Sequence, residues 1–192
     1  VNVDGVESIT MLALQAGVRV FVHMSSSSVY GPYRGTPFDE GAHREPQDDY
    51  GRSKRDGEDV VWNRVREGLP AIVVRPCTVY GPGCTDGAGK VFSRPAKFGA
   101  IPGNGRQLLA NVRVEDVAAA SHHLSLREDA IGRAFNVVDD SRPSIEEALA
   151  LAAEAFGAKP PRAHVPLGLV VVAARVSGFA ARLAGRIPDL ES

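Results

Sequence analysis

The chain has 192 residues, of which 44% are hydrophobic and 23% are charged, and its formal net charge is −1. Enough apolar side chains are present to form a core, so the composition excludes an intrinsically disordered chain. The near-neutral charge gives no indication of a nucleic acid or an acidic membrane as a partner. Cys77 and Cys84 are too few for a disulfide framework, and their spacing does not match a metal site. We therefore expect no metal and a reducing, cytoplasmic compartment.

The first part of the chain alternates helical and strand patterns. Asp4 followed by Glu7 is typical of a helix start, and Gly17 suits the position just beyond a helix end. Residues 18–24 are rich in β-branched side chains and mostly apolar, which predicts a strand. After a loop at residues 31–47, a second helix is expected from Asp48 or Asp49 to Gly68.

The alternation continues to the end of the chain. Its expected elements are strands at 71–75, 112–114 and 134–138, a helix at 115–126, and a helix from the capping box Ser144–Glu147 to Gly157. Residues 81–106 are rich in Gly and Pro and are expected to be irregular. Alternating helices and strands favour an α/β fold with a parallel sheet.

The apolar stretch at residues 165–184 raises the question of membrane contact. Arg175 and Arg182 interrupt it, so its longest uncharged run is shorter than the roughly 20 residues that a membrane span needs. We expect a packed amphipathic helix there and no membrane partner.

Tyr50 and Lys54 form the motif with the clearest chemical meaning. On a helix, positions i and i+4 share a face, and a nearby ammonium favours the ionised tyrosine. Such a pair can exchange a proton with a hydroxyl or carbonyl. The alternative is a tyrosine and a solvated lysine one turn apart. Ser25 and Ser26 follow the first expected strand, at the kind of sheet edge where α/β proteins place ligands; the alternative for them is a turn.

The order of several short motifs resembles the extended short-chain dehydrogenases/reductases, the NAD-dependent epimerase/dehydratase group. The resemblance covers nearly the whole chain. The matching segments are Asn2-Val3-Asp4-Gly5, Gly17-Val18, Phe21 to Ser26, Val29-Tyr30-Gly31, Pro37 to Glu40, Tyr50 to Lys54, Arg75-Pro76, Val79 to Gly83, Ile101 to Gly105, Val114 to Ala118 and Phe135-Asn136-Val137.

The resemblance implies a role for individual residues. Ser26 matches the catalytic Ser or Thr, Tyr50 the catalytic acid/base, and Lys54 the lysine that binds the nicotinamide ribose and favours the ionised tyrosine. Four further residues match positions that line the nicotinamide end of the cofactor: Ser25, Pro76, Cys77 and Val79. Asn2 matches a helix-start residue that either lies near the cofactor or caps the helix. The implied cofactor is NAD or NADP, with NAD favoured, and the family commonly forms homodimers.

The family's Gly-rich dinucleotide fingerprint does not occur in this sequence, and residue 1 is Val. We expect a fragment of a longer enzyme with a partial Rossmann-like domain at residues 1–80 and 111–138. The small substrate-binding lobe is expected at 81–110 and 139–192. Because that fingerprint normally binds the pyrophosphate, these 192 residues are expected to bind NAD(P) weakly or not at all by themselves.

Departures from the family pattern bear on the substrate. Ser27-Ser28 stand where the resembling 4,6-dehydratases carry Asp-Glu, which disfavours dehydratase chemistry. Leu109 stands where sugar-nucleotide epimerases carry an Arg that clamps the diphosphate, although Arg106 or Arg113 could substitute. These departures favour a hydroxysteroid-like or other alcohol/ketone substrate, with a nucleotide-sugar epimerase as the alternative. A third hypothesis is a non-catalytic protein that retains the fold.

Overall fold

The computed structural model describes residues 2–32, 37–84 and 100–169. The chain divides into two compact units. Unit 1 comprises Val1–Cys84 and Ala110–Asp140, and unit 2 comprises Thr85–Leu109 and Ser141–Ser192.

Unit 1 alternates helices and strands, as the sequence predicts. Its elements in chain order are α1 (Asn2–Gln15), β1 (Phe21–Met24), the 3-10 helix η1 (Ser27–Tyr30), α2 (Asp49–Arg66), β2 (Ala71–Pro76), β3 (Thr78–Tyr80), β5 (Asn111–Arg113), α4 (Val114–Ser125), the 3-10 helix η3 (Glu128–Ala130) and β6 (Ala134–Val137).

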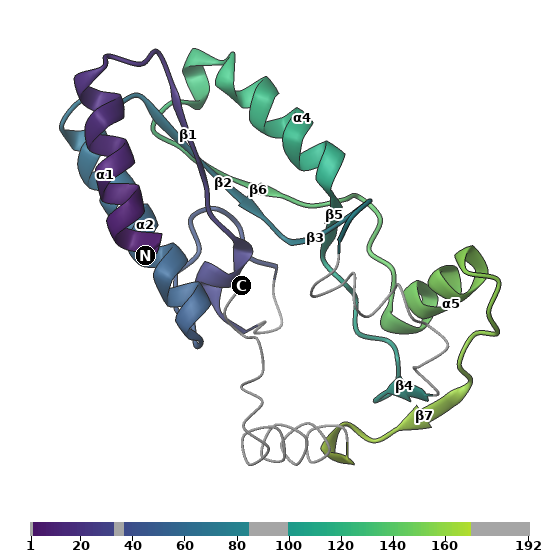
Figure 1. The fold of residues 1–192 in the computed structure, drawn as a ribbon. Helices are drawn as coiled ribbons and strands as arrows, with labels where there is room; N and C mark the ends of the chain where they lie inside the picture. Colours follow the sequence, from purple (N-terminus) through teal and green to yellow (C-terminus); the bar gives the residue numbers. More distant parts are fainter. Residues whose placement is uncertain (1, 33–36, 85–99, 170–192) are drawn as a thin grey trace, which may run out of the picture. The chain divides into compact units, whose positions relative to one another are not determined.

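A parallel sheet with the strand order β1-β2-β6 forms the centre of unit 1. Phe21 pairs with Ala71, and Val74 pairs with Phe135, so the strands end at one common edge. The helices α1 and α2 lie side by side on one face of the sheet, and α4 lies on the other (Figure 1). The predicted α/β class, a parallel sheet with flanking helices, is confirmed.

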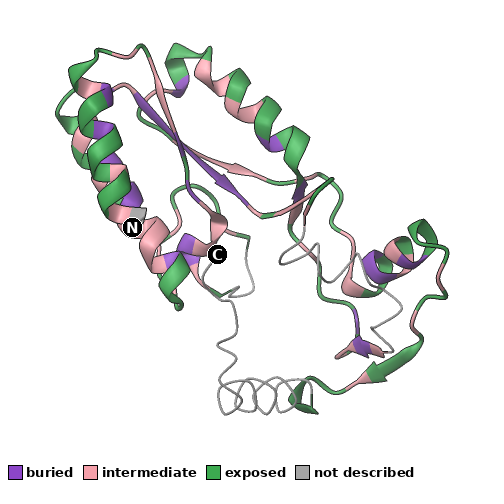
Figure 2. Ribbon diagram, in the orientation of Figure 1, coloured by how far each residue is buried: buried purple, intermediate pink, exposed green. Residues whose placement is uncertain are grey.

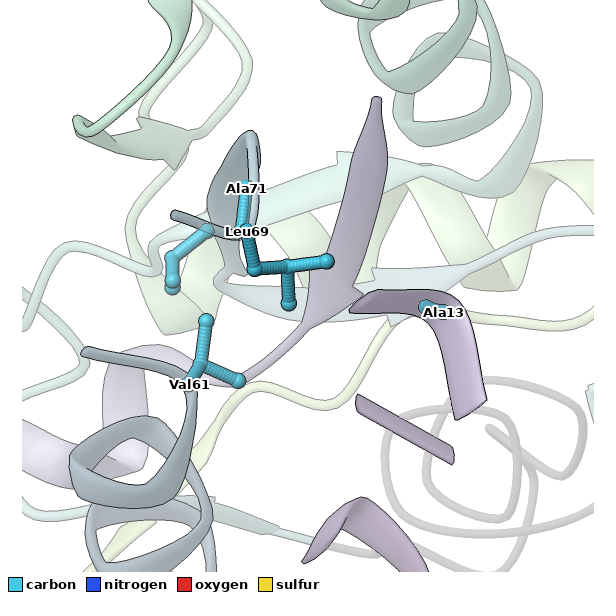
Figure 3. Packing of buried hydrophobic residues seen from close by; sticks show 5 residues of the cluster. Ala13, Val61, Leu69 and Ala71 are labelled. Atoms are coloured by element: carbon cyan, nitrogen blue, oxygen red, sulfur yellow. The ribbon is translucent and has the colours of Figure 1, made fainter. Parts of the chain in front are cut away.

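The central strand β2 is buried along its whole length (Figure 2). Helices cover both faces of a parallel sheet, which is why this strand reads as a continuous apolar run. One cluster of the core joins Ala13 of α1 and Val61 of α2 to Leu69, Ala71 and Val73 around β2 (Figure 3). This cluster fixes the two helices against the sheet.

Local signals account for most element boundaries in unit 1. Gly17 follows α1 with a φ of 62°, a conformation that favours glycine. Asp48 caps α2, with its carboxylate accepting a 2.6 Å hydrogen bond from the Gly51 amide. Asp4 lies within the first turn of α1 rather than at its N-cap, because the helix already begins at Asn2.

Unit 2 contains β4 (Ala100–Pro102), α5 (Ile145–Ala155) and β7 (Ala163–Val165). The predicted capping box is confirmed, since the Ser144 hydroxyl accepts from the Glu147 amide while Glu147 accepts from the Ser144 amide. The parallel pair β4 and β7 was not predicted, because three-residue strands leave too short a pattern to detect. Most of the helix expected at residues 165–184 lies outside the described residues.

Candidate functional site

The carboxyl end of β1 carries the two predicted serines. The Ser25 amide donates to the Val74 carbonyl at 2.8 Å, which continues the pairing with β2, and the residue is only 4% exposed. Ser26 is the N-cap of η1, where its hydroxyl accepts from the Ser28 amide at 3.2 Å and lies 3.1 Å from the Ser28 hydroxyl. Ser26 therefore lies at the sheet edge with its hydroxyl engaged in its own turn.

Tyr50 and Lys54 lie one turn apart near the start of α2. The Lys54 Nζ atom is 5.8 Å from the centre of the Tyr50 ring and donates a 3.2 Å hydrogen bond to the Met24 carbonyl. Met24 is the last residue of β1, so this bond brings Lys54 to the strand end beside Ser25. The Tyr50 side chain is exposed, with 53% of its surface accessible. A substrate oxygen can therefore reach it from solvent.

Gly51 allows the start of α2 to approach η1 closely. A Cβ atom on Gly51 would lie 2.7 Å from the Ser28 carbonyl oxygen and 2.8 Å from Pro46 Cβ. Both distances are shorter than real Cβ contacts, so a side chain would force the two elements apart. The glycine beside Tyr50 thus permits the contact with the turn that Ser26 caps.

Two of the other predicted residues share this sheet edge. Pro76 ends β2, and the Cys77 amide donates to the Val137 carbonyl of β6 at 3.0 Å. Val79 lies farther along, in β3, where it pairs with Val112 of β5. The structure brings Ser25, Ser26, Lys54, Pro76 and Cys77 to the carboxyl ends of neighbouring parallel strands.

A buried ion pair lies beneath this edge, and sequence reasoning did not find it. Arg75 Nε and Nη2 donate to the two Glu58 carboxylate oxygens at 2.8 and 2.7 Å, and the residues are 3% and 0% exposed. Arg44 adds a second cation at 3.0 Å from Glu58 Oε2. Burial alone would raise the pKa of Glu58, but the Arg75 hydrogen bonds and the charges of both arginines outweigh it, so the pKa lies below its usual value.

The tyrosine of the Val29-Tyr30-Gly31 motif belongs to the same buried network. Arg75 Nη1 donates to the Tyr30 hydroxyl at 2.6 Å, and that hydroxyl donates to Asn136 Oδ1 at 2.8 Å. The Tyr30 ring also stacks on Phe38 with centroids 5.1 Å apart. Burial raises the pKa of Tyr30 despite its bond from Arg75. These contacts make Tyr30 a structural residue that joins η1 to β2 and β6.

His23 is a second buried titratable group near the site. It lies on β1, facing α2 at Gly57, where a Cβ atom would sit 3.8 Å from His23 Nε2. Burial and the charge of Lys54 lower the pKa of His23 from 6.5 to about 4, against an opposing effect of Glu58. The imidazole is therefore neutral near pH 7.

Three further features of the described residues bear on the sequence-based expectations: metal-binding clusters, membrane-spanning helices and the position of Asn2. In the described ranges, no cluster of His, Cys, Asp and Glu side chains could hold a metal ion. None of the helices described there is long and apolar enough to cross a membrane. Asn2 stands at the first position of α1.

A family model described as the NAD dependent epimerase/dehydratase family matches residues 1–137, well over half of the chain. The chain belongs to the NAD dependent epimerase/dehydratase family. The resemblance drawn from the short motifs is thereby confirmed.

Members of the family are similar to this chain in sequence and fold. UDP-glucose 4-epimerase of Vibrio cholerae is 30% identical over 118 residues, which cover 57% of this chain and 36% of that protein. The structure of UDP-glucuronic acid 4-epimerase from Bacillus cereus with NAD matches with a TM-score of 0.74 at 21% identity, covering 86% of this chain and 56% of that one. MoeE5 in complex with UDP-glucose and NAD gives a TM-score of 0.71 at 29% identity, covering 86% and 57%.

The chain therefore spans about a third of this curated epimerase and little more than half of these two solved structures. The fold at 21% identity supports the architecture, while the family assignment rests on the match to residues 1–137.

Proposed function

We propose that this chain is part of an NAD(P)-dependent enzyme that transfers a proton and a hydride at an alcohol or carbonyl carbon. The observation that carries the proposal is the placement of Lys54, within 5.8 Å of the Tyr50 ring centre and bonded to the Met24 carbonyl at the end of β1. Ligands of open α/β sheets bind outside the carboxyl ends of the strands. A proton-transferring pair at that edge suits an oxidoreductase.

The side chains at this edge have the donors that the nicotinamide-ribose end of NAD(P) requires. An ammonium suits ribose hydroxyl oxygens, and Lys54 already donates to an oxygen acceptor. Pro76 and Cys77 at the end of β2, with Ser25 and Val79, are assigned to the wall around the nicotinamide. NAD is favoured over NADP, because MoeE5, which is 29% identical to this chain, was solved with NAD. The bound cofactor would accept the hydride or return it.

Each proposed catalytic side chain has one task. The Tyr50 oxygen takes the proton of the substrate hydroxyl as the carbonyl forms, and returns it in the reverse direction. Lys54 holds the ribose hydroxyls through its ammonium group. Ser26 orients the substrate oxygen, for which its hydroxyl exchanges the Ser28 contact for the substrate.

We infer that the substrate is a nucleotide sugar. The Vibrio cholerae relative is a UDP-glucose 4-epimerase, and MoeE5 was solved with UDP-glucose. The hydroxysteroid-like substrate favoured by Leu109 receives no support from these relatives. We assign the residues around β4, β7 and α5 in unit 2 to the substrate-binding lobe, and unit 1 to the cofactor-binding domain.

We also propose a homodimer formed through α1 and α2. Ile9 and Leu12 lie one turn apart on α1, and both are more than half exposed. Large apolar side chains on one exposed helix face are typical of a contact surface.

Replacing Tyr50 by Phe in the complete protein tests the function. With UDP-glucose or an alcohol substrate and NAD(P), we expect kcat to fall by about 10²- to 10⁴-fold, the usual contribution of a general acid/base. The dissociation constant of the cofactor should change little, because the ring remains.

The matched control is Ser53→Ala, which removes a hydroxyl from the same turn of α2. Its hydroxyl donates to the Tyr50 backbone carbonyl, an ordinary contact within a helix. Full turnover in Tyr50→Phe, or absence of cofactor-dependent turnover in the wild type, contradicts the proposed function. The latter result would favour a non-catalytic protein that retains the fold.

A further inference from the structure

The buried pair of Glu58 and Arg75 takes no part in the proposed proton transfer, yet it connects the elements that carry the site. Glu58 follows Lys54 by one turn of α2, and Arg75 precedes Pro76 at the end of β2. Two hydrogen bonds of 2.8 and 2.7 Å join them. Neither side chain is appreciably exposed, so water does not screen the pair.

Arg75 also reaches the turn that Ser26 caps. Its Nη1 atom donates to the Tyr30 hydroxyl at 2.6 Å and to the Glu40 carbonyl at 3.1 Å. Its guanidinium lies over the Tyr30 ring, 5.1 Å from the ring centre. The end of β2, the turn after β1 and helix α2 therefore meet at this one side chain.

A buried ion pair is a weak source of stability, because the loss of hydration of two charges offsets their attraction. Such a pair does fix the relative position of the two elements that carry it, because two parallel charge-assisted hydrogen bonds form only within a narrow range of distance and angle. The bond from Lys54 to the Met24 carbonyl depends on the same geometry, since it requires α2 to hold one position along β1.

We propose that Glu58 and Arg75 are a positioning pair that sets the place of α2 against the parallel sheet and thereby holds Lys54 at the carboxyl end of β1. The importance of Lys54 for catalysis rests on the proposed function. The position of Lys54 does not, because the chemical reactivity of its amine can be measured without turnover.

Asp59 provides a matched control for Glu58. It is the next residue of α2, it accepts a 2.6 Å bond from Arg44 Nη2, and its side chain is 52% exposed. Glu58→Gln and Asp59→Asn each remove one negative charge and one ion pair of Arg44. Only Glu58→Gln leaves the Arg75 guanidinium buried without its anion.

The first measurement is the acetylation rate of the Lys54 amine in the folded complete protein, followed by mass spectrometry with exposed Lys159 as internal reference. If the pair holds Lys54 in place, Glu58→Gln should raise the relative rate by about fivefold or more, the factor produced by a modest loss of local stability. Asp59→Asn should leave it unchanged. Equal rates in the two variants would overturn the proposal.

The double variant Glu58→Met with Arg75→Met separates positioning from stability. Apolar side chains of similar size commonly replace a buried ion pair without loss of folding. The proposal expects a folded protein in which Lys54 still reacts faster than in the wild type. Wild-type reactivity in this folded double variant would show that the pair only stabilises the fold, and would overturn the proposal.

Turnover distinguishes this inference from the proposed function. We expect kcat to fall by about tenfold in Glu58→Gln, as for a misplaced positioning group, and to stay near wild type in Asp59→Asn. If even the wild type lacks turnover, the proposed function fails, while the Lys54 rates still decide the positioning role. If wild-type turnover requires Tyr50 but Glu58→Gln matches the wild type in both measurements, the positioning role alone fails.

Discussion

Arg75 is a charged residue at a position of strand β2 where the strand pattern favours a buried apolar side chain. Ala71 and Val73 of β2 pack against α1 and α2, and the alternation of a strand directs residue 75 to the same face. The sequence has arginine there, and its charge is accommodated because Glu58 lies opposite on α2. Removing one partner of such a pair leaves an uncompensated buried charge, which costs about 3–5 kcal/mol.

His23 should lower the free energy of unfolding of the protein as the pH falls below 7. The pKa of His23 is about 4 in the folded chain against 6.5 when unfolded. Between these values the unfolded chain binds a proton that the folded chain does not, so stability falls as the pH falls. From pH 7 to pH 5 the free energy of unfolding should drop by about 2 kcal/mol in the wild type, as linkage requires.

Urea unfolding at the two pH values measures this effect. His23→Gln should remove the drop, whereas His123→Gln, a change of an exposed residue on α4, should retain it. An undiminished acid dependence in His23→Gln would show that other groups cause it.

Helix α2 contains two glycines, Gly51 and Gly57, whose surroundings differ. Gly51 lies where η1 approaches too closely for any side chain, with the Ser28 carbonyl oxygen 2.7 Å from a Cβ position. At Gly57 the nearest atoms to that position are Val6 Cγ2 at 3.6 Å and His23 Nε2 at 3.8 Å, which are ordinary contacts. The first glycine is therefore required by packing, and the second is not.

Alanine at these two positions should have opposite effects on the free energy of unfolding. Gly51→Ala should lower it by about 1–3 kcal/mol, the usual result of overpacking. Gly57→Ala should raise it by about 0.5–1 kcal/mol, because alanine restricts the unfolded chain and fits the helix better. Chemical denaturation compares the variants directly, each serving as the control for the other. A stabilising Gly51→Ala would contradict the close approach of α2 and η1.

Among the described residues, unit 1 has an apolar surface on helix α1 that no other residue covers. Ile9, Met11 and Leu12 of α1 are 51%, 43% and 54% exposed, while Thr10 and Ala13 of the same helix are buried. Helix α1 packs along α2, so this surface adjoins the helix that carries Tyr50 and Lys54. A dimer formed there would cover it.

Leu12→Asp should weaken this dimer by at least about tenfold, because a charge placed in an apolar contact costs more than 1.4 kcal/mol. Sedimentation velocity over a range of concentrations measures the dissociation constant. Leu151→Asp is the matched control, since Leu151 is similarly exposed but lies on α5 of unit 2. A monomeric wild type, or equal effects of both variants, would contradict the proposed surface.

Sequence by itself determined the α/β class, most element boundaries and the Tyr50–Lys54 pair. These depend on local signals, such as Asp48 as a helix cap, Gly17 after a helix end and the i, i+4 spacing of the pair. Such signals act within a few residues and are visible in one chain segment.

Only the tertiary structure decided which residues surround that pair. The sequence pattern predicts only that Glu58 lies in a helix and that Arg75 lies at the end of a strand. Their hydrogen bond joins two separate elements, and no local signal predicts it. The Tyr30 bond to Asn136 and the burial of His23 have the same origin. The packing of the helices on the sheet determines which of these side chains meet. A local sequence pattern does not predict such contacts.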